Sequence, residues 1–495
     1  MATRPADLLV IGGGTAGLVA AVGAAGQGAR AVLAERERTG GDCLWTGCVP
    51  SKALLTVAQA AHTARSSHHL GVRVTGDVEV DWAAALAHVR GAQAAIAPHD
   101  SPERLRREGV EVVAGTARFV APDTVEIDGR PRRFRRAMIA TGSQPVVPGL
   151  PGMAEVDALT SDTVWDLEVL PARLVVLGGG PIGCELAQAF ARLGVQVTLI
   201  ELAAGLLPRE EPAAQQVIAT RLRAEGVDVR TATKALRVVH DEQGTGLLLE
   251  PVGTCQRTDP DRAATTISDA EVVGFDRLLV AAGRRPRTDG LGLQAAGVQR
   301  DARGAVVVDE QLRTTNPRIW AGGDVTMLLP FTHVAAAHGA TVVQNALFGL
   351  RRRVDHERIP WVTFTDPEVA RVGLTQAEAR ERYGEEVRVR TAGHDHLDRA
   401  ITAGRTEGFA TLVGDPKGRI VGASVVGPRA GEVIGEVVAW MQQNTTIGRI
   451  TRTTHAYPTW TEDLTAASLE ELRAGLARLR PATRALLATR RLLGR

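Results

Sequence analysis

The sequence contains one pattern twice, and this duplication restricts the folds open to the chain. A short apolar run at residues 7–11 leads into the turn GGGTAG at residues 12–17 and then into an alanine-rich helix. A second run at residues 174–177 leads into GGGPIG at residues 178–183 and another helix. Glycine lets the backbone turn tightly, approach a pyrophosphate and pack helix on strand. The pattern predicts two related dinucleotide-binding domains.

An acidic residue follows each turn at the same distance. Glu35 lies eighteen residues beyond Gly17, and Glu201 lies eighteen residues beyond Gly183. A carboxylate at the end of the second strand can bind ribose hydroxyls. Glu201 would also repel a 2′-phosphate, and no arginine follows it before Arg209. NADH is therefore favoured over NADPH.

The two copies also end alike. MIATG at residues 138–142 is followed by Pro145, and LVAAG at residues 279–283 is followed by Pro286. A third glycine-rich segment, AGGD, ends at Asp324 after another short strand. It places an acid against the hydroxyls of a second ligand, or it is a plain turn.

Half of the four cysteines lie in the segment GGDCLWTGCVPSK, residues 40–52. Cys43 and Cys48 are five positions apart, so one turn can bring their sulfurs together as a reversible disulfide. Lys52, one of only three lysines, follows them. A structural disulfide or two buried thiols is the alternative for the cysteines alone.

Composition limits the class of protein. The 495 residues suggest three or four domains, and a formal charge of +2 argues against general nucleic-acid binding. Few cysteines favour a reducing compartment. No signal peptide or membrane-spanning apolar stretch is recognisable, so we expect a cytoplasmic protein.

Between and after the glycine turns, the pattern is less specific. Helices are predicted over residues 52–66 and 82–97, and residues 254–269 are predicted to form an exposed hairpin or loop. No metal-ligand cluster is found. His394 and His396 come closest, and we expect both to be solvated.

With these motifs in this order, residues 6–465 resemble the class I pyridine nucleotide-disulfide oxidoreductases, the family of dihydrolipoamide dehydrogenase, glutathione reductase and mercuric reductase. The resemblance implies an α/β fold, with two Rossmann-like dinucleotide-binding domains and a C-terminal α+β dimerisation domain in a homodimer. The implied domains are FAD-binding (1–160 and 286–356), NAD-binding (161–285) and dimerisation (357–465), followed by a basic helical tail (466–495).

The resemblance also implies which residues bind the cofactors. Those for FAD are Gly12, Gly14, Gly17, Glu35, Lys52, Ala117, Thr141, Gly142 and Asp324. Those for the nicotinamide nucleotide are Gly178, Gly180, Gly183, Glu201 and Gly283. Cys48 would lie against the flavin and Cys43 would meet the substrate. Lys52, paired with Glu185, would stabilise negative charge that develops on the reduced flavin.

One segment departs from the family pattern. The disulfide reductases of the family carry His-Pro-Thr-x-x-Glu near the C-terminus, and this histidine is their acid/base. Here Tyr457 takes the place of the histidine, while Glu462 remains. A tyrosine with a pKa near ~10 is a poor proton acceptor at neutral pH. His455 would lie on the same side as Tyr457 if the segment were extended, and it is the alternative base.

Mercuric reductases resemble this chain in having a tyrosine in that region. They usually add a C-terminal cysteine pair and often an N-terminal metal-binding domain, whereas no cysteine follows Cys255 here. We therefore expect an FAD-dependent oxidoreductase that passes electrons from NADH through FAD and the cysteine pair, or directly from the flavin, to a metal ion, quinone or similar acceptor. A dihydrolipoamide dehydrogenase-like or small-disulfide reductase is the first alternative. A non-catalytic interaction subunit is the second.

The tail beyond residue 465 has leucines at helical spacing, and after Glu471 it has seven arginines and no acids. Pro481 is predicted to split it into two helices. It is expected to pack on its own dimer with a solvated basic face. The alternative is peripheral attachment to an anionic membrane.

Overall fold

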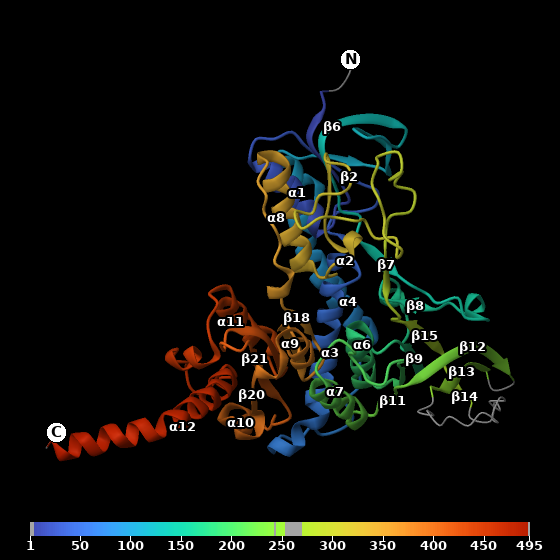
Figure 1. Ribbon diagram of the computed structural model, residues 1–495. Helices are drawn as coiled ribbons and strands as arrows, with labels where there is room; N and C mark the ends of the chain where they lie inside the picture. Colours follow the sequence, from blue (N-terminus) through green and yellow to red (C-terminus); the bar gives the residue numbers. More distant parts are fainter. Residues whose placement is uncertain (1–3, 242–243, 253–269, 494–495) are drawn as a thin grey trace, which may run out of the picture. The chain divides into compact units, whose positions relative to one another are not determined.

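The computed structural model describes residues 4–241, 244–252 and 270–493. The chain packs as two compact units. The first combines the chain up to Ala204 with Glu225–Val354, and the second combines Gly205–Ala224 with the chain from Asp355 onward. Figure 1 labels many of the helices and strands of both units.

The first unit contains a sheet that begins with the first glycine turn. Its strands are β1 (Ala6–Ile11), β2 (Ala31–Glu35), β3 (Glu111–Ala114), β4 (Ala117–Ala121), β5 (Thr124–Ile127), β6 (Arg130–Ile139) and β17 (Ile319–Ala321). The order is β3-β2-β1-β6-β5-β4, with β17 also on β6. Strands β1, β2, β3, β6 and β17 pair in parallel, whereas β4, β5 and β6 pair antiparallel.

Side chains alternate between the two faces of this sheet because a strand has a period of two. Leu8 and Val10 pack in a core that includes residues of α1 (Thr15–Gly26) and α8 (Thr332–Phe348). Leu9 and Ile11 face a second core on the other side. The predicted strand at residues 7–11 is therefore confirmed as a central, doubly covered strand.

A second parallel sheet in the same unit repeats this arrangement. Its strands are β8 (Leu159–Thr160), β9 (Arg173–Leu177), β10 (Gln196–Ile200), β11 (Asp228–Arg230) and β15 (Arg277–Val280), in the order β11-β10-β9-β15-β8. Helix α6 (Pro181–Arg192) follows β9 through the second glycine turn. Strands β12 (Thr233–Asp241), β13 (Gly244–Pro251) and β14 (Glu271–Gly274) form a small antiparallel sheet. The loop or hairpin predicted over residues 254–269 lies outside the described residues.

The cysteine segment lies between β2 and β3, on helices α2 (Gly41–Trp45) and α3 (Cys48–Ser66). Helix α4 (Trp82–Ile96) follows before β3. Both predicted helices are confirmed, but α3 begins at Cys48 rather than Lys52. Pro50 does not prevent the earlier start, because a first-turn residue has no intrahelical N–H bond to lose.

The closing motifs of the two nucleotide-binding sheets meet in the structure. Strand β7 (Ser143–Pro145) pairs antiparallel with β16 (Arg284–Pro286). The Val146 amide also donates to the Gly283 carbonyl at 3.0 Å, and the Arg287 amide donates to the Gly142 carbonyl at 2.9 Å. This two-stranded ribbon joins the carboxyl ends of the two sheets.

The second unit is built on an antiparallel sheet. Its strands are β18 (Trp361–Thr363), β19 (Glu368–Gly373), β20 (Arg388–Gly393), β21 (Phe409–Gly414) and β22 (Ile420–Gly427), in the order β18-β19-β22-β21-β20. Its helices include α7 (Pro212–Ala224), α9 (Gln376–Tyr383), α10 (Asp398–Ala403), α11 (Ala430–Gln442) and α12 (Glu462–Leu492). The predicted class, two dinucleotide-binding α/β sheets followed by an α+β region, is confirmed.

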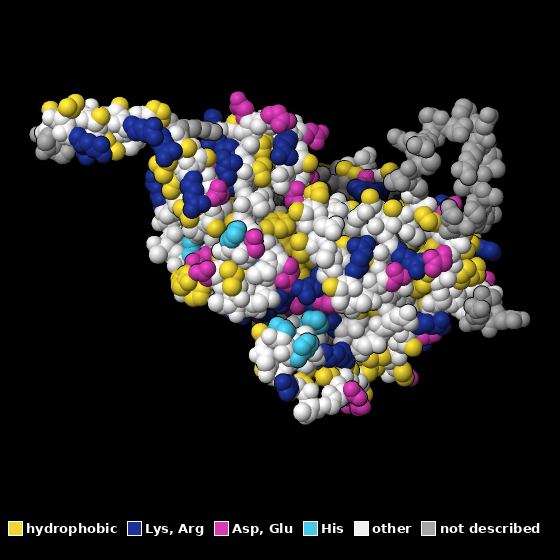
Figure 2. Space-filling view, turned by 90° about the horizontal axis from the view of Figure 1, so that it is seen from below, with side chains coloured by type: hydrophobic (Ala, Val, Ile, Leu, Met, Phe, Trp, Pro, Cys, Tyr) yellow, Lys and Arg dark blue, Asp and Glu magenta, His cyan; other side chains and the backbone are white. Residues whose placement is uncertain are grey.

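The tail forms one helix, so the prediction that Pro481 splits it in two is wrong. Proline removes one N–H donor, and the carbonyl it leaves belongs to an exposed turn of α12, where water can bind it. Leu472, Leu476 and Leu479 are exposed along the helix, Leu476 by 57%. Figure 2 shows yellow apolar and dark blue basic side chains together on the outer part of this helix. Among the described residues, no helix is long and apolar enough to cross a membrane.

Candidate active site

The two cysteines are held on either side of a tight turn between α2 and α3. Cys43 lies in α2, and Cys48 is the first residue of α3. The Asp42 carbonyl accepts the Thr46 amide at 2.9 Å and the Gly47 amide at 2.5 Å, which closes the turn. We call residues 40–48 the redox turn. It places Cys48 at a helix N-terminus, where the dipole favours a thiolate.

The two thiols have opposite pKa shifts. The pKa of Cys48 is lowered to about 6, mainly by the hydrogen bond from Cys43 and further by Thr332 and Lys52, against the effect of burial. The pKa of Cys43 is raised, because it keeps the shared proton next to Cys48 and is partly buried. The reduced pair therefore carries one thiolate, on Cys48, and one thiol, on Cys43.

Two contacts around the thiolate come from separate helices. The Thr332 hydroxyl at the start of α8 lies 3.3 Å from the Cys48 sulfur. Lys52, one turn after Cys48 in α3, pairs with the buried Glu185 of α6 with an Nζ to Oε2 distance of 2.8 Å. The ion pair between Lys52 and Glu185 that the resemblance implies is thus formed.

The acids Glu35 and Glu201 support the glycine turns in the same way. Glu35 Oε2 accepts the Gly13 amide at 2.6 Å, and Glu201 Oε2 accepts the Gly179 amide at 2.6 Å. The other oxygen of each carboxylate accepts the amide two residues farther along the chain, at 2.8 Å and 2.7 Å. The duplication in the sequence is therefore matched bond for bond.

Space around the glycine turns fits a dinucleotide. A Cβ on Gly17 would lie 1.9 Å from the Gly12 carbonyl oxygen, so helix and turn pack without room for a side chain. Gly14 has no heavy atom nearer than 3.7 Å to such a Cβ, and Gly180 has none within 4 Å. Neither α1 nor α6 has a side-chain cap on its N-terminal amides. Open, uncapped helix N-termini suit the phosphates of FAD and of a nicotinamide nucleotide.

Other predicted cofactor residues lie at the carboxyl edges of the sheets. Thr141 and Gly142 follow β6, Gly283 follows β15, and Asp324 follows β17. The Asp324 carboxylate accepts the Ser143 hydroxyl at 2.8 Å. Ala117 is buried at the start of β4.

In the second unit, Tyr457 does not resemble a base. Its side chain is 71% exposed, and its hydroxyl donates to Asp398 Oδ2 at 2.7 Å. This hydrogen bond to a carboxylate raises the pKa of Tyr457. The group is therefore protonated throughout the neutral range.

His455 and Tyr457 contact different groups in the second unit. The segment bends at Tyr457 and its following proline instead of running extended. The His455 ring is largely buried, with Nε2 2.9 Å from Glu436 Oε1 and Nδ1 2.9 Å from the Thr465 hydroxyl. Both ring nitrogens are engaged within the unit. Glu462 begins α12 and accepts the Thr459 amide at 2.9 Å.

The prediction that His394 is solvated is wrong. Its side chain is 1% exposed, and Nε2 lies 3.2 Å from the buried Asp463. The ring occupies space left by Gly408 and Gly427, where a Cβ would lie within 2.5 Å of ring atoms. His396 is exposed, as predicted. Among the described residues, no group of three or more His, Cys, Asp or Glu could hold a metal ion.

Sequence reasoning missed two parts of the site. One is Thr332, which contacts the Cys48 sulfur and is the first residue of α8, eight positions after Asp324. The other is a charged cluster around Arg284, the residue after Gly283, which contacts Asp42 beside Cys43. The position of Arg284 in the second closing motif was the available signal.

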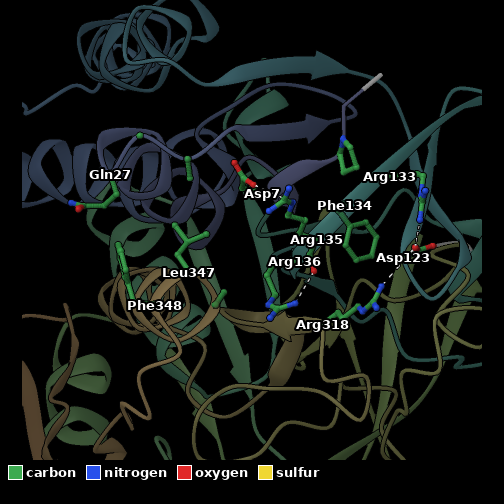
Figure 3. A pocket seen from close by; sticks show the side chains of 14 residues that line it. Asp7, Gln27, Asp123, Arg133, Phe134, Arg135, Arg136, Arg318, Leu347 and Phe348 are labelled. Atoms are coloured by element: carbon green, nitrogen blue, oxygen red, sulfur yellow. Dashed lines mark hydrogen bonds and ion pairs between the residues drawn. The ribbon is translucent and has the colours of Figure 1, made fainter. Parts of the chain in front are cut away.

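A surface cavity of about 630 Å³ lies elsewhere on the first unit (Figure 3). It is lined by Asp7, Arg136, Arg318 and Phe348, among others. Asp7 is near the amino end of β1, whereas the glycine turn is at the carboxyl end. Ligands of open α/β sheets bind at carboxyl ends, so this cavity is not the dinucleotide site.

Comparison with known families now identifies the chain. A model described as "Pyridine nucleotide-disulphide oxidoreductase" matches residues 6–339, and the model of that family's dimerisation domain matches residues 359–468. The chain belongs to the pyridine nucleotide-disulphide oxidoreductase family. It is therefore an FAD-dependent enzyme that uses a nicotinamide nucleotide, and its dimerisation domain makes it a homodimer. The alternative interpretation, a non-catalytic interaction subunit, is therefore wrong.

Relatives within the family have different names. A mercuric reductase of Streptomyces lividans is 39% identical over 469 residues, covering 93% of this chain and 95% of the relative. A dihydrolipoyl dehydrogenase of Thermus scotoductus is 35% identical over 476 residues, covering 93% and 96%. The Cu(II) complex of the HOCl-induced flavoprotein disulfide reductase RclA from Escherichia coli is 28% identical, with a TM-score of 0.79 over 94% of this chain and 99% of that one.

The thiolate on Cys48 should be visible by its absorbance beside the flavin. Enzyme reduced with one equivalent of NADH should show a long-wavelength charge-transfer band. Because the pKa of Cys48 is lowered to about 6, the band should be full above neutral pH and disappear as the pH falls through about 6. A pH titration of the absorbance measures this.

The controls are two single variants. Cys48→Ser should remove the band. Cys43→Ala cannot form the disulfide, so its band should already be present in the oxidised enzyme before NADH is added, with a midpoint that moves upward because the hydrogen bond from Cys43 is lost. A band that persists in Cys48→Ser would mean that another group is the donor.

Proposed function

We propose that Cys43 and Cys48 are the redox centre of this enzyme, and that they transfer electrons to a soft metal ion. The lowered pKa of Cys48 carries this proposal, because a stable thiolate beside a protonated partner is what a cycling disulfide needs. Lys52 and Glu185 are proposed to stabilise charge at the flavin side. We also propose that the cofactor-binding residues and the domain boundaries given in the sequence analysis are correct.

When bound, FAD would supply the disulfide with an electron pair that comes from the nicotinamide nucleotide as hydride. On cleavage, Cys48 becomes a thiolate that Thr332 and Lys52 stabilise, and Cys43 takes up one proton. Cys43 then faces the acceptor. Two electrons and one proton thus open the disulfide, and reoxidation by one mercury(II) or two copper(II) ions returns the proton and closes it.

Three observations favour a metal ion over a disulfide substrate. A disulfide substrate leaves a thiolate that must be protonated, and Tyr457 is exposed with a raised pKa. Two sulfurs on one turn suit a soft ion. The mercuric reductase of S. lividans and the Cu(II) complex of RclA are similar along nearly the whole chain. A quinone is a further acceptor that needs no thiolate protonation.

Reduction of a small disulfide is the second candidate function. The contact between His455 and Glu436 favours it, because a carboxylate can orient an imidazole as a base. The similarity to a dihydrolipoyl dehydrogenase also favours it. Against it, the second nitrogen of His455 is held by Thr465.

Tyr457→His separates the two functions. Turnover of lipoamide should rise by about 10-fold or more, because a general acid/base contributes roughly 10²- to 10⁴-fold and Glu462 is present to orient an imidazole. Reduction of mercury(II) or copper(II) should stay constant or fall. The measurement is kcat/KM for each acceptor with saturating NADH.

Tyr457→Phe is the matched control, and it should leave lipoamide turnover as slow as in the native enzyme. His455→Ala should have little effect on metal reduction. Fast native lipoamide turnover that collapses only in His455→Ala would overturn the preference for a metal ion.

We also propose NADH as the preferred reductant. The Glu201 carboxylate accepts the Gly179 amide of the second glycine turn, and we propose that its charge repels a 2′-phosphate, so kcat/KM should favour NADH over NADPH by at least ~10-fold. Glu201→Gln keeps an oxygen that can accept the Gly179 amide but removes the negative charge. It should therefore reduce the ratio of kcat/KM for NADH to kcat/KM for NADPH. Equal use of both nucleotides by the native enzyme would contradict the proposal.

Two further hypotheses concern where the enzyme works. Few cysteines fit the reducing cytoplasm as its location. The outer part of α12, with exposed leucines and arginines, keeps peripheral attachment to an anionic membrane as a hypothesis beside packing on the dimer. Salt-sensitive binding to anionic vesicles, lost on truncation after Asp463, would be needed to establish it.

A further inference from the structure

We infer that Arg284 is a positioning residue: it fixes the redox turn through Asp42 and links it to Asp324 through Ser143. The inference rests on the proposed redox role of Cys43 and Cys48. It gives Arg284, Asp42 and Ser143 a role in the redox reaction, although none of them is a thiol or part of a glycine turn.

Arg284 is itself rigidly held. It begins β16 directly after Gly283, and its side chain is 17% exposed. Its Nε donates to the Ser143 hydroxyl at 2.8 Å, and Nη2 donates to the Ser143 carbonyl at 3.1 Å. Nη1 donates to the Ser161 hydroxyl at 3.1 Å. The guanidinium is therefore fixed on the ribbon that joins the two nucleotide-binding sheets.

From this fixed position, Arg284 makes an ion pair with Asp42 of the redox turn. Arg287 approaches the other Asp42 oxygen at 3.4 Å. Asp162 completes a quartet, at 3.6 Å from Arg284 and 3.4 Å from Arg287. Two cations and two carboxylates alternate, and all four side chains are at most a third exposed, so removal of one leaves a charge poorly compensated.

The redox turn needs such an anchor because α2 has only five residues and short helices are marginal alone. Asp42 directly precedes Cys43, and its carbonyl accepts the Thr46 and Gly47 amides. The Thr46 carbonyl accepts the Trp165 indole N–H at 2.9 Å. A shift of Asp42 would therefore move Cys43 away from Cys48, and the hydrogen bond between them is the main cause of the lowered pKa of Cys48.

The other end of the link reaches the proposed flavin site. The Ser143 hydroxyl, which accepts from Arg284, donates to Asp324 Oδ2 at 2.8 Å. The Arg284 guanidinium thus fixes the position of Asp42 directly, next to Cys43, and the position of Asp324 through Ser143, at the proposed flavin site. A displacement as small as about 1 Å at such a site can cost about 10²-fold in rate.

The test compares Arg284→Met, Asp42→Asn and the double variant in the FAD-loaded enzyme. Two readouts are independent of turnover: hydrogen exchange of the peptide that contains Gly47, and the rate at which iodoacetamide alkylates Cys43 in the reduced enzyme. Each single variant should raise both rates by about 10-fold, because the turn loosens and Cys43 loses its proton-holding contact. The double variant should be no worse than either single variant, since the two residues act as one pair.

Arg285→Met is the matched control. Arg285 is the next residue of β16, is half exposed and pairs with Asp289 at the surface. Its variant should retain native rates in both readouts. Asp42→Asn is nearly isosteric, so it keeps the test decisive if Arg284→Met does not fold.

The inference is overturned if Asp42→Asn has native exchange and alkylation rates. It is equally overturned if Arg284→Met loses FAD while the redox turn stays native, since the arginine would then bind the cofactor directly. Failure of the proposed function is a separate result: the native enzyme would form no disulfide between Cys43 and Cys48 on air oxidation.

Discussion

The site depends on a backbone-to-backbone contact between two glycine-rich turns. A Cβ on Gly41, which has a positive φ of +61°, would lie 2.7 Å from the Gly14 Cα. The Gly40 amide also donates to the Gly13 carbonyl at 2.9 Å. This contact places the redox turn directly against the N-terminus of α1, which is suited to bind the pyrophosphate of FAD. Elements of one unit thereby bring the cysteine pair next to the proposed flavin site.

The groups around Cys43 and Cys48 stabilise one thiolate, on Cys48, and disfavour a second one on Cys43. Cys43, Thr332 and Lys52 all stabilise negative charge on Cys48, while the proton remains on Cys43. The nearby Asp42 carboxylate does not add a free negative charge, because Arg284 and Arg287 neutralise it. Tyr457 supplies no base. Cys43 and Cys48 are thus suited to an electron acceptor that does not need a proton from an enzyme base.

The sequence predicted those features that follow from local chain geometry. The glycine turns, the acids at matched offsets, and helices α3 and α4 each have a pattern within about twenty residues. The ribbon of β7 and β16 pairs residues about 140 positions apart, so no local pattern reveals it. The prediction that His394 is solvated failed because the space for its ring is created by two distant glycines, Gly408 just before β21 and Gly427 at the end of β22. The contact of Thr332 with Cys48 likewise depends on how α8 packs.

The most direct test of the account is a rapid-mixing measurement on the native enzyme. Enzyme reduced by one equivalent of NADH is mixed at pH 7.5 with mercury(II), copper(II) or lipoamide. Formation of elemental mercury, copper(I) or dihydrolipoamide is followed together with the long-wavelength band, because a metal ion that only binds the thiolate would also remove the band. The metal ions should reoxidise the enzyme at least ~100-fold faster than lipoamide, since an acid/base contributes at least that factor to disulfide reduction. The metal reaction should also be lost in Cys43→Ser. Reoxidation by lipoamide at the same rate as by the metal ions would contradict the central claim.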